Sequence, residues 1–305
     1  VTGVQTCALP ILAGTVRRNA PEFHQAKVYL DAYAQESGAG GSSYPTVNKD
    51  VLDALNTGNL VWNYSGHGGY KRLAEENILD LQQAEALSNE NRLPLFITST
   101  CDVAPYDNPL VTSLGERLLL RPKTGAIALM TTTRLVFAYS NKVMNNNYLT
   151  VAFKRKTGGY FPTLGESIQQ AKNLTYQFFG DIINNRKFTL LGDPALRLGF
   201  PDYRVNTTAV NGRPVANGSD TLGALSSCKV TGTVTDAGGN LLSGFNGTLY
   251  ASVYEKPEQA RTKGNDPGSL PVAFERQDNL IFRGKARVEA GQFQFSFIVP
   301  RDIDY

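Results

Sequence analysis

Two apolar stretches, LVWNYSGHGG at 60–69 and PLFITSTCDVAPYDNP at 94–109, decide the fold of this chain. Each begins with apolar and β-branched residues, a composition typical of a strand buried inside a sheet. Each then ends on a reactive side chain, His67 in the first stretch and Cys101 in the second. Because a helix-length segment separates the two strands, we expect them to run parallel and to place both side chains at one edge of the sheet.

The alternation of strands and helices extends outward from these stretches, from Glu22 to about Phe200. Besides the two central strands, strands are predicted at 26–33, 125–133 and 188–194. Helices are predicted from a cap at Thr46 or Asn48 to a stop at Gly58, and at 77–89, 113–121, 141–156 and 164–183. Strands separated by helices imply an α/β domain, with a mostly parallel sheet and helices on both faces.

After Pro201 the sequence changes to short polar strands punctuated by glycine. Four segments alternate polar and apolar residues, namely CKVTGTVTD, TLYASVYE, LIFRGKARVEA and QFQFSFIVP. This pattern favours an antiparallel, Ig-like β-sandwich. We therefore predict an α/β domain at 22–200 and a β-sandwich domain at 201–305, which we expect to be incomplete because the sequence stops directly after a strand.

The N-terminal segment VTGVQTCALPI shares no pattern with the rest of the chain, and it resembles translated sequencing-adaptor read-through. We expect residues 1–21 to be non-native or linker sequence that lies outside the fold. No stretch of the chain reaches the roughly 18 consecutive apolar residues that a membrane-spanning helix needs. The fragment is therefore expected to be soluble.

Composition excludes several classes of function. The chain has 305 residues, with 30 Lys and Arg against 27 Asp and Glu, and it has no basic run with interleaved aromatic residues. Nucleic acid is therefore not an expected partner. The 3 cysteines and 2 histidines show neither CxxC nor HExxH spacing, which argues against a disulfide framework and a zinc site. We expect no cofactor and no metal.

The strand-end pair predicts nucleophilic chemistry. If the two strands are neighbours, imidazole and thiol meet across a strand spacing of roughly 5 Å, close enough for His67 to take the thiol proton of Cys101. Glycines at 66, 68 and 69 would let the backbone adopt positive φ and let a substrate approach closely. The backbone N–H groups of Gly68 and Cys101 are the candidate oxyanion donors.

Other residues are weaker candidates, and each has a plain structural interpretation. Gly69, Tyr70, Thr133 and Arg134 follow the predicted strands and are candidate substrate contacts, with Arg134 suited to a carboxylate. A surface arginine is the alternative for Arg134. Asp102 is interpreted as loop structure. A cysteine that ends a buried strand is often only a packed thiol, but its pairing with a second strand that ends in histidine favours catalysis.

This joint pattern resembles the caspase-like cysteine peptidases, in which one strand ends in His-Gly and a later strand ends in Cys. The resemblance is closest to the gingipain-type family, and within it to the sortases of the Bacteroidota type IX secretion system. It rests on seven phrases of the sequence: KVYLDAY, YPTVNKDVLDALNTGNLVWNYSGHGG, PLFITSTCDVAPYDNP, GAIALMTTTR, LLGDPALRLGFP, GTVTDAGGNLLSGFNGTLYASVYEKP and FSFIVPRDIDY.

The resemblance implies a caspase-like fold and a cysteine endopeptidase or transpeptidase at the cell surface. Its substrates would be secreted cargo proteins, cleaved before a C-terminal sorting domain through an acyl-enzyme on Cys101. The acyl group would pass to a lipopolysaccharide amine or to water, and other type IX secretion components would be partners. Gingipains have an upstream acidic residue that helps the histidine or binds substrate. That region would fall before residue 22, so we name no third catalytic residue.

Two alternatives remain open at this point. A general secreted protease of the same family differs only in its substrate. A non-catalytic surface or adhesion module would keep the caspase-like scaffold without the chemistry.

Overall fold

The computed structural model describes residues 3–38, 41–218, 221–265 and 269–303. The chain divides into two compact units, Val1–Phe200 with Ala260–Phe274, and Pro201–Gln259 with Glu275–Tyr305. The first division falls where the sequence pattern changes. The segment 260–274 joins the first unit through its contacts in space, which no local sequence pattern indicates. We call these units 1 and 2.

A four-stranded sheet forms the centre of unit 1, with the strand order β3-β6-β7-β8. Its strands are β3 (Val61–Ser65), β6 (Leu95–Ser99), β7 (Ala128–Thr132) and β8 (Phe188–Leu191). The pairs β3–β6 and β6–β7 are parallel, whereas β8 runs antiparallel to β7. Every residue of β6 and β7 is buried, as expected for strands covered on both faces. The predicted mostly parallel sheet is confirmed.

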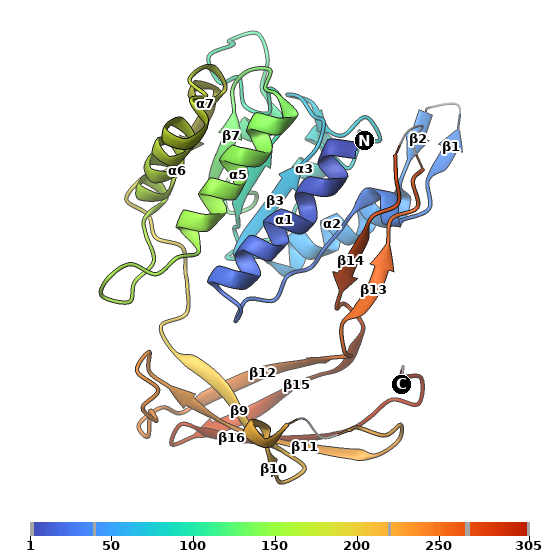
Figure 1. The fold of residues 1–305 in the computed structure, drawn as a ribbon, viewed down its shortest axis with the longest axis vertical. Coiled ribbons are helices and arrows are strands. Elements are labelled where there is room, and N and C mark those ends of the chain that lie inside the picture. The colour runs from blue at the N-terminus through green and yellow to red at the C-terminus, as the bar shows by residue number, and fades with distance from the viewer. Residues whose placement is uncertain (1–2, 39–40, 219–220, 266–268, 304–305) are drawn as a thin grey trace. The chain divides into compact units, whose positions relative to one another are not determined.

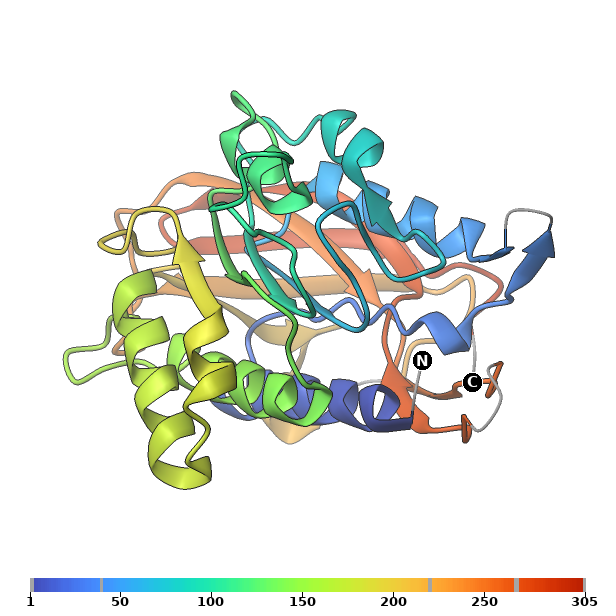
Figure 2. The same ribbon diagram turned by 90° about the horizontal axis from the view of Figure 1, so that it is seen from above.

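Helices cover both faces of this sheet (Figures 1 and 2). One layer comprises α1 (Gly3–Asn19), α5 (Ala138–Ala152) and α6 (Leu164–Phe179), with the short α7 (Ile183–Lys187) next to α5 and α6. The other layer comprises α2 (Pro45–Thr57), α3 (Leu81–Glu85) and α4 (Leu114–Leu120). Two apolar clusters fill the spaces between the layers and the sheet. Phe96 faces the second layer, and Ile97 faces the first.

Local sequence explains where most helices begin. Asp80, Ser113 and Thr163 each cap a helix in a capping box with the residue three positions later. The predicted cap of α2 was wrong, because Pro45 occupies the first turn after Tyr44 and no side chain caps the helix. Asn48 instead donates its side-chain amide to the carbonyl oxygens of residues 77 and 78, at 2.6 and 3.2 Å.

Three helix predictions extended past the observed ends, and one stop was placed correctly. The helix predicted at 141–156 is α5, which ends at Ala152. The segment 77–89 contains only the short helix α3, preceded by β5 (Leu79–Asp80), which pairs with β4 (Arg72–Leu73). Helix α6 ends at Gly180, whose φ of 62° is left-handed, and so falls short of residue 183. Gly58, with φ of 103°, ends α2 as predicted.

The first 33 residues differ most from the sequence expectations. Residues 1–21 were expected to lie outside the fold, but α1 packs on α5, and Leu12, Val16 and Ala20 from its second half and C-terminal end are buried in the core. The strand predicted at 26–33 is absent; this segment contains only a 3₁₀ turn at Leu30–Ala32. Its anchor is Asp31, whose carboxylate accepts hydrogen bonds from the backbone of Gly264 and Asn265, at 2.8 and 2.6 Å.

Unit 2 is an antiparallel β-structure, as predicted. It contains one six-stranded sheet, ordered β10-β9-β11-β16-β15-β12. Its strands are β9 (Arg204–Val210), β10 (Arg213–Pro214), β11 (Ser227–Thr235), β12 (Gly247–Tyr254), β15 (Leu280–Glu289) and β16 (Gln292–Ile298). Over the described residues β15 and β16 pair only next to the turn that joins them, Val288 with Phe293 and Glu289 with Gln292. Beyond these pairs Phe282 of β15 stacks on Phe295 and Phe297 of β16, in an apolar cluster that also includes Val230 of β11 and Val253 of β12. Cys228 is a buried thiol on this sheet.

Two short hairpins complete the described structure. β1 (Glu36–Gly38) pairs with β2 (Gly41–Ser43), and β13 (Glu258–Arg261) pairs with β14 (Ala273–Arg276). Within the described part of the chain, no helix has both the length and the apolar character that crossing a bilayer demands.

Candidate active site

The sheet places His67 and Cys101 at the ends of adjacent strands. β3 pairs with β6 in parallel, and the register ends with Ser65 opposite Ser99. His67 and Cys101 each lie two residues beyond that last pair. The prediction that their strands are neighbours with both carboxyl ends at one edge is therefore confirmed.

The turn that carries His67 packs directly on the strand that carries Cys101. A Cβ atom built on Gly68 would lie 3.0 Å from Thr100 Oγ1 and 3.1 Å from Thr100 Cγ2. Only glycine therefore fits at this position without a shift of its neighbours. The φ angles at residues 66, 68 and 69 are not positive, so the expectation of left-handed backbone there was wrong. Close approach is the reason for glycine at residue 68.

The backbone of His67 is held from two directions. Its carbonyl oxygen accepts a hydrogen bond from the Tyr64 hydroxyl at 2.7 Å and another from the Ala74 N–H at 2.8 Å. Burial raises the pKa of Tyr64 above its ordinary value, so the phenol stays protonated and remains a donor. His67 itself is exposed. An anchored main chain thus presents an imidazole that is open to solvent and to substrate.

The thiol of Cys101 contacts the backbone of Val136. The Val136 N–H donates to Cys101 Sγ at 3.4 Å, and the thiol donates to the Val136 carbonyl at 3.5 Å. Both described hydrogen bonds of the Cys101 thiol go to Val136, and neither involves His67. Catalytic hydrogen bonds are often long before substrate binds.

The loop after Cys101 is tied to the loop after β7. Asp102 has a left-handed φ of 44°, and its N–H donates to the Arg134 carbonyl at 3.4 Å. The Ala104 N–H donates to the carbonyl of Thr132 at 3.1 Å. Because Asp102 turns the chain out of the strand conformation, it acts as loop structure, in agreement with the sequence interpretation.

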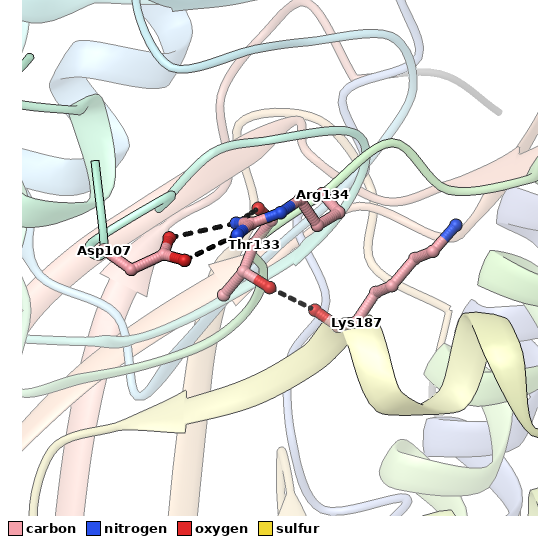
Figure 3. Close-up of polar contacts among 4 residues, drawn as sticks. All are labelled: Asp107, Thr133, Arg134 and Lys187. Atoms are coloured by element: carbon pink, nitrogen blue, oxygen red, sulfur yellow. Dashed lines mark hydrogen bonds and ion pairs between the residues drawn. The ribbon is translucent and has the colours of Figure 1, made fainter.

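An ion pair closes the same junction (Figure 3). The Arg134 guanidinium donates to both carboxylate oxygens of Asp107, at 3.0 and 2.5 Å. This hydrogen bonding lowers the pKa of Asp107 from its ordinary value and raises the pKa of Arg134. The carboxylate that Arg134 holds in this structure is therefore one from its own chain.

The remaining candidate contacts lie in the loops around this edge. Thr133 donates from its N–H and its hydroxyl to the Lys187 carbonyl, at 3.0 and 3.3 Å, so it tethers the loop after β7 to α7 (Figure 3). The Tyr70 carbonyl accepts from the N–H of Leu114 at 2.6 Å, while the Gly69 N–H donates to Arg72 at 3.0 Å. These bonds order the turn beside His67. Substrate contacts at these residues stay a prediction, as do the oxyanion donors Gly68 and Cys101.

Sequence reasoning missed Val136 and Asp107. Val136 lies 35 residues beyond Cys101, in a loop with no motif of its own. Asp107 sits in the stretch quoted for Cys101, but only the fold brings it to Arg134. The apolar run LVF at 135–137, which begins three residues after the end of β7, was the one signal that pointed to this loop.

Comparison with known proteins identifies a family and several similar structures. The sequence profile of peptidase family C25 matches residues 5–199. The crystal structure of the Arg specific cysteine proteinase gingipain R (RgpB) is similar over 84% of this chain and 50% of that chain, with 16% identity and a TM-score of 0.46. The complex of Porphyromonas gingivalis RgpB pro- and mature domains aligns over 84% of this chain and 51% of that chain, with 16% identity and a TM-score of 0.44.

A third solved structure, dimeric latent PorU from Porphyromonas gingivalis, aligns over 61% of this chain and 17% of that chain, with 29% identity and a TM-score of 0.33. The chain spans about half the length of the two RgpB structures, and a smaller share of the PorU structure. None of the curated proteins matches the sequence.

Proposed function

Since the chain belongs to peptidase family C25, a family of cysteine peptidases, we propose that it acts through a dyad in which Cys101 is the nucleophile and His67 the general base. One observation carries the proposal. The parallel register of β3 and β6 ends at Ser65 and Ser99, and each proposed catalytic residue lies two positions later. The contact of Gly68 with Thr100 then joins the two strand ends.

The chemistry follows from these roles. His67 takes the proton of the Cys101 thiol, and the thiolate attacks the carbonyl carbon of a peptide bond. The resulting oxyanion accepts hydrogen bonds from the backbone N–H groups of Gly68 and Cys101. When the tetrahedral intermediate collapses, the C–N bond breaks, and His67 returns its proton to the departing amine. A thioester to Cys101 remains.

The second half-reaction decides between protease and sortase. Water attacking the thioester gives hydrolysis, and an amine gives transpeptidation; in both cases His67 removes a proton from the entering group, and the thiol is released. We propose the sortase-like outcome, with secreted cargo carrying a C-terminal sorting domain as substrate and a lipopolysaccharide amine as acceptor. The phrases shared with type IX secretion sortases support this assignment, and with it a place at the outer-membrane surface beside other secretion components.

The decisive experiment replaces the nucleophile and a second thiol in parallel. Cys101→Ala should abolish cleavage of a purified cargo protein with its sorting domain, and thermal unfolding should change little because Cys101 is only half-buried. Cys228→Ala is the matched control, since it removes a buried thiol on the other unit and should keep cleavage. Mass spectrometry of the cargo in the presence of an added amine separates hydrolysis from transfer. Processing by the Cys101→Ala protein would refute the proposed nucleophile.

A non-catalytic surface module is the competing function. The contact of the thiol with Val136, in place of His67, is the observation that favours it. Alkylation by iodoacetamide separates the two functions. A catalytic thiol should react faster than free cysteine at neutral pH and lose that advantage in His67→Ala, whereas an inert thiol should react slowly in both proteins.

A further inference from the structure

The loop that contacts the nucleophile presents two apolar side chains to solvent. This loop comprises residues 133–137, between β7 and α5, and we call it the 133–137 loop. Leu135 and Phe137 are each 68% exposed. They flank Val136, whose backbone contacts Cys101 Sγ. Single exposed apolar residues are common on protein surfaces, so exposure by itself decides nothing.

Every residue of the 133–137 loop has a backbone N–H or carbonyl group that is hydrogen-bonded to another part of the chain. Hydrogen bonds join Thr133 N–H to the Lys187 carbonyl at 3.0 Å and the Arg134 carbonyl to the Asp102 N–H at 3.4 Å. Lys187 Nζ also donates to the carbonyl of residue 135 at 2.7 Å, and Asn184 Oδ1 accepts from the N–H of residue 137 at 3.1 Å. The Val136 bond to sulfur completes the series. The two apolar side chains are therefore held out by an ordered backbone.

Two charged side chains that contact this loop, those of Asp107 and Lys187, are engaged within the chain. Arg134 is its only charged residue, and Asp107 pairs with that guanidinium. Lys187 uses its ammonium group on the Leu135 carbonyl and lies 5.4 Å from the centre of the Phe137 ring. The 133–137 loop thus offers a substrate no acidic side chain for a basic residue and no unengaged cation for an acidic one. The contact that this loop can make with a substrate is therefore apolar, through Leu135 and Phe137.

We infer that Leu135 and Phe137 form a specificity surface that binds apolar side chains of the peptide next to the carbonyl attacked by Cys101. This inference rests on the proposed function, because it needs Cys101 to be the nucleophile. A preorganised apolar surface loses little conformational entropy on binding, and it gains from covering area that is now exposed to water. Substrates with leucine or phenylalanine near the reacting carbonyl should therefore acylate Cys101 faster than substrates with charged residues.

The test uses peptidyl acyloxymethyl ketones that differ only in the side chain next to the ketone, with Leu, Phe, Lys, Glu or Ser at that position. The Cys101 sulfur bonds to the methylene carbon, and the carboxylate leaves with the electron pair, which gives a stable thioether. Intact-protein mass spectrometry measures the rate and locates the adduct. Wild-type protein should react with the Leu and Phe probes about tenfold faster than with the other three, a ratio typical of apolar subsites.

Three variants and one matched control test which side chains set the preference. Leu135→Ala and Phe137→Ala should each reduce the advantage of the Leu and Phe probes several-fold, whereas Phe137→Leu should retain most of it. Leu120→Ala is the control, because Leu120 is 72% exposed at the end of α4 and lies outside the 133–137 loop. Its probe selectivity should match that of the wild type.

The outcomes separate this inference from the proposed function. Fastest reaction with the Lys or Glu probe, or unchanged selectivity in both alanine variants, would overturn the apolar surface while leaving the nucleophile in place. If neither the probes nor iodoacetamide modified Cys101, the proposed nucleophile would fall, and the specificity surface with it.

Discussion

Replacing Gly68 with alanine is the sharpest perturbation of the proposed dyad, because its effect can be worked out from three distances. The added Cβ would lie 3.0 and 3.1 Å from Thr100 Oγ1 and Cγ2, and 3.2 Å from Leu73 Cδ2. Ordinary contacts of this kind begin at 3.4 Å, so the turn must move by about 0.4 Å. If a displacement of about 1 Å costs roughly 100-fold in rate, about 0.4 Å predicts a loss of about sixfold.

The assay is the rate at which Cys101 reacts with a peptidyl ketone, measured together with the free energy of unfolding. Gly68→Ala should lower that rate about sixfold and destabilise unit 1 by about 1 kcal/mol, at the low end for overpacking. Gly199→Ala is the matched control, since its Cβ would meet no atom within 4 Å and its φ is not positive. That variant should resemble the wild type in both measurements.

A second substitution tests the cause. Thr100→Ala removes both of the shortest contacts, so it should restore most of the lost rate when combined with Gly68→Ala. Thr100 Oγ1 has no hydrogen-bond partner among the described groups, so Thr100→Ala alone should cost little. A double variant as slow as Gly68→Ala itself would refute the reasoning that the His67 turn rests on Thr100.

Three further predictions concern the supports of the site and of unit 1. Asp107→Asn should slow peptide processing several-fold with little change in unfolding temperature, because the exposed pair orders the loops at Cys101; exchanging both charges, Asp107→Arg with Arg134→Asp, should restore part of the rate. Asp31→Ala should destabilise the chain by about 1–3 kcal/mol, since two part-buried N–H groups lose their charged acceptor, and limited proteolysis should then cut within 262–272. Burial raises the pKa of Tyr29 from 10.0 to about 12, so stability from the neutral phenol should be complete below about pH 10 and lost as the pH rises toward 12, which denaturant titrations at several pH values would detect.

Local sequence signals were sufficient for the strands that carry the proposed dyad. The apolar, β-branched runs before His67 and Cys101 form β3 and β6 as predicted, and their parallel pairing agrees with the long connection between them. Capping boxes at Asp80, Ser113 and Thr163 likewise depend on residues only three positions apart. Such features are readable because the interacting groups are close neighbours along the chain.

The wrong predictions concern segments whose structure depends on residues far away in the sequence. The segment 26–33 has the composition of a strand, but a strand needs a hydrogen-bonded partner, and Asp31 is bound instead to backbone N–H groups 233 and 234 residues away. The segment that forms α1 was set aside because it resembles adaptor read-through, yet α1 packs on α5, and Leu12 and Val16 are buried in the core. No local pattern reports either interaction.

The amino-acid sequence alone determined which two strand ends carry the thiol and the imidazole, because strand formation depends on side chains close in sequence. Only the tertiary structure decided what surrounds the thiol: Val136 at the sulfur, Asp107 on Arg134, and Leu135 and Phe137 exposed beside them. Those contacts join residues about 30 positions apart, and whether they form depends on how the intervening helix and strand pack on the sheet, which composition and periodicity do not encode.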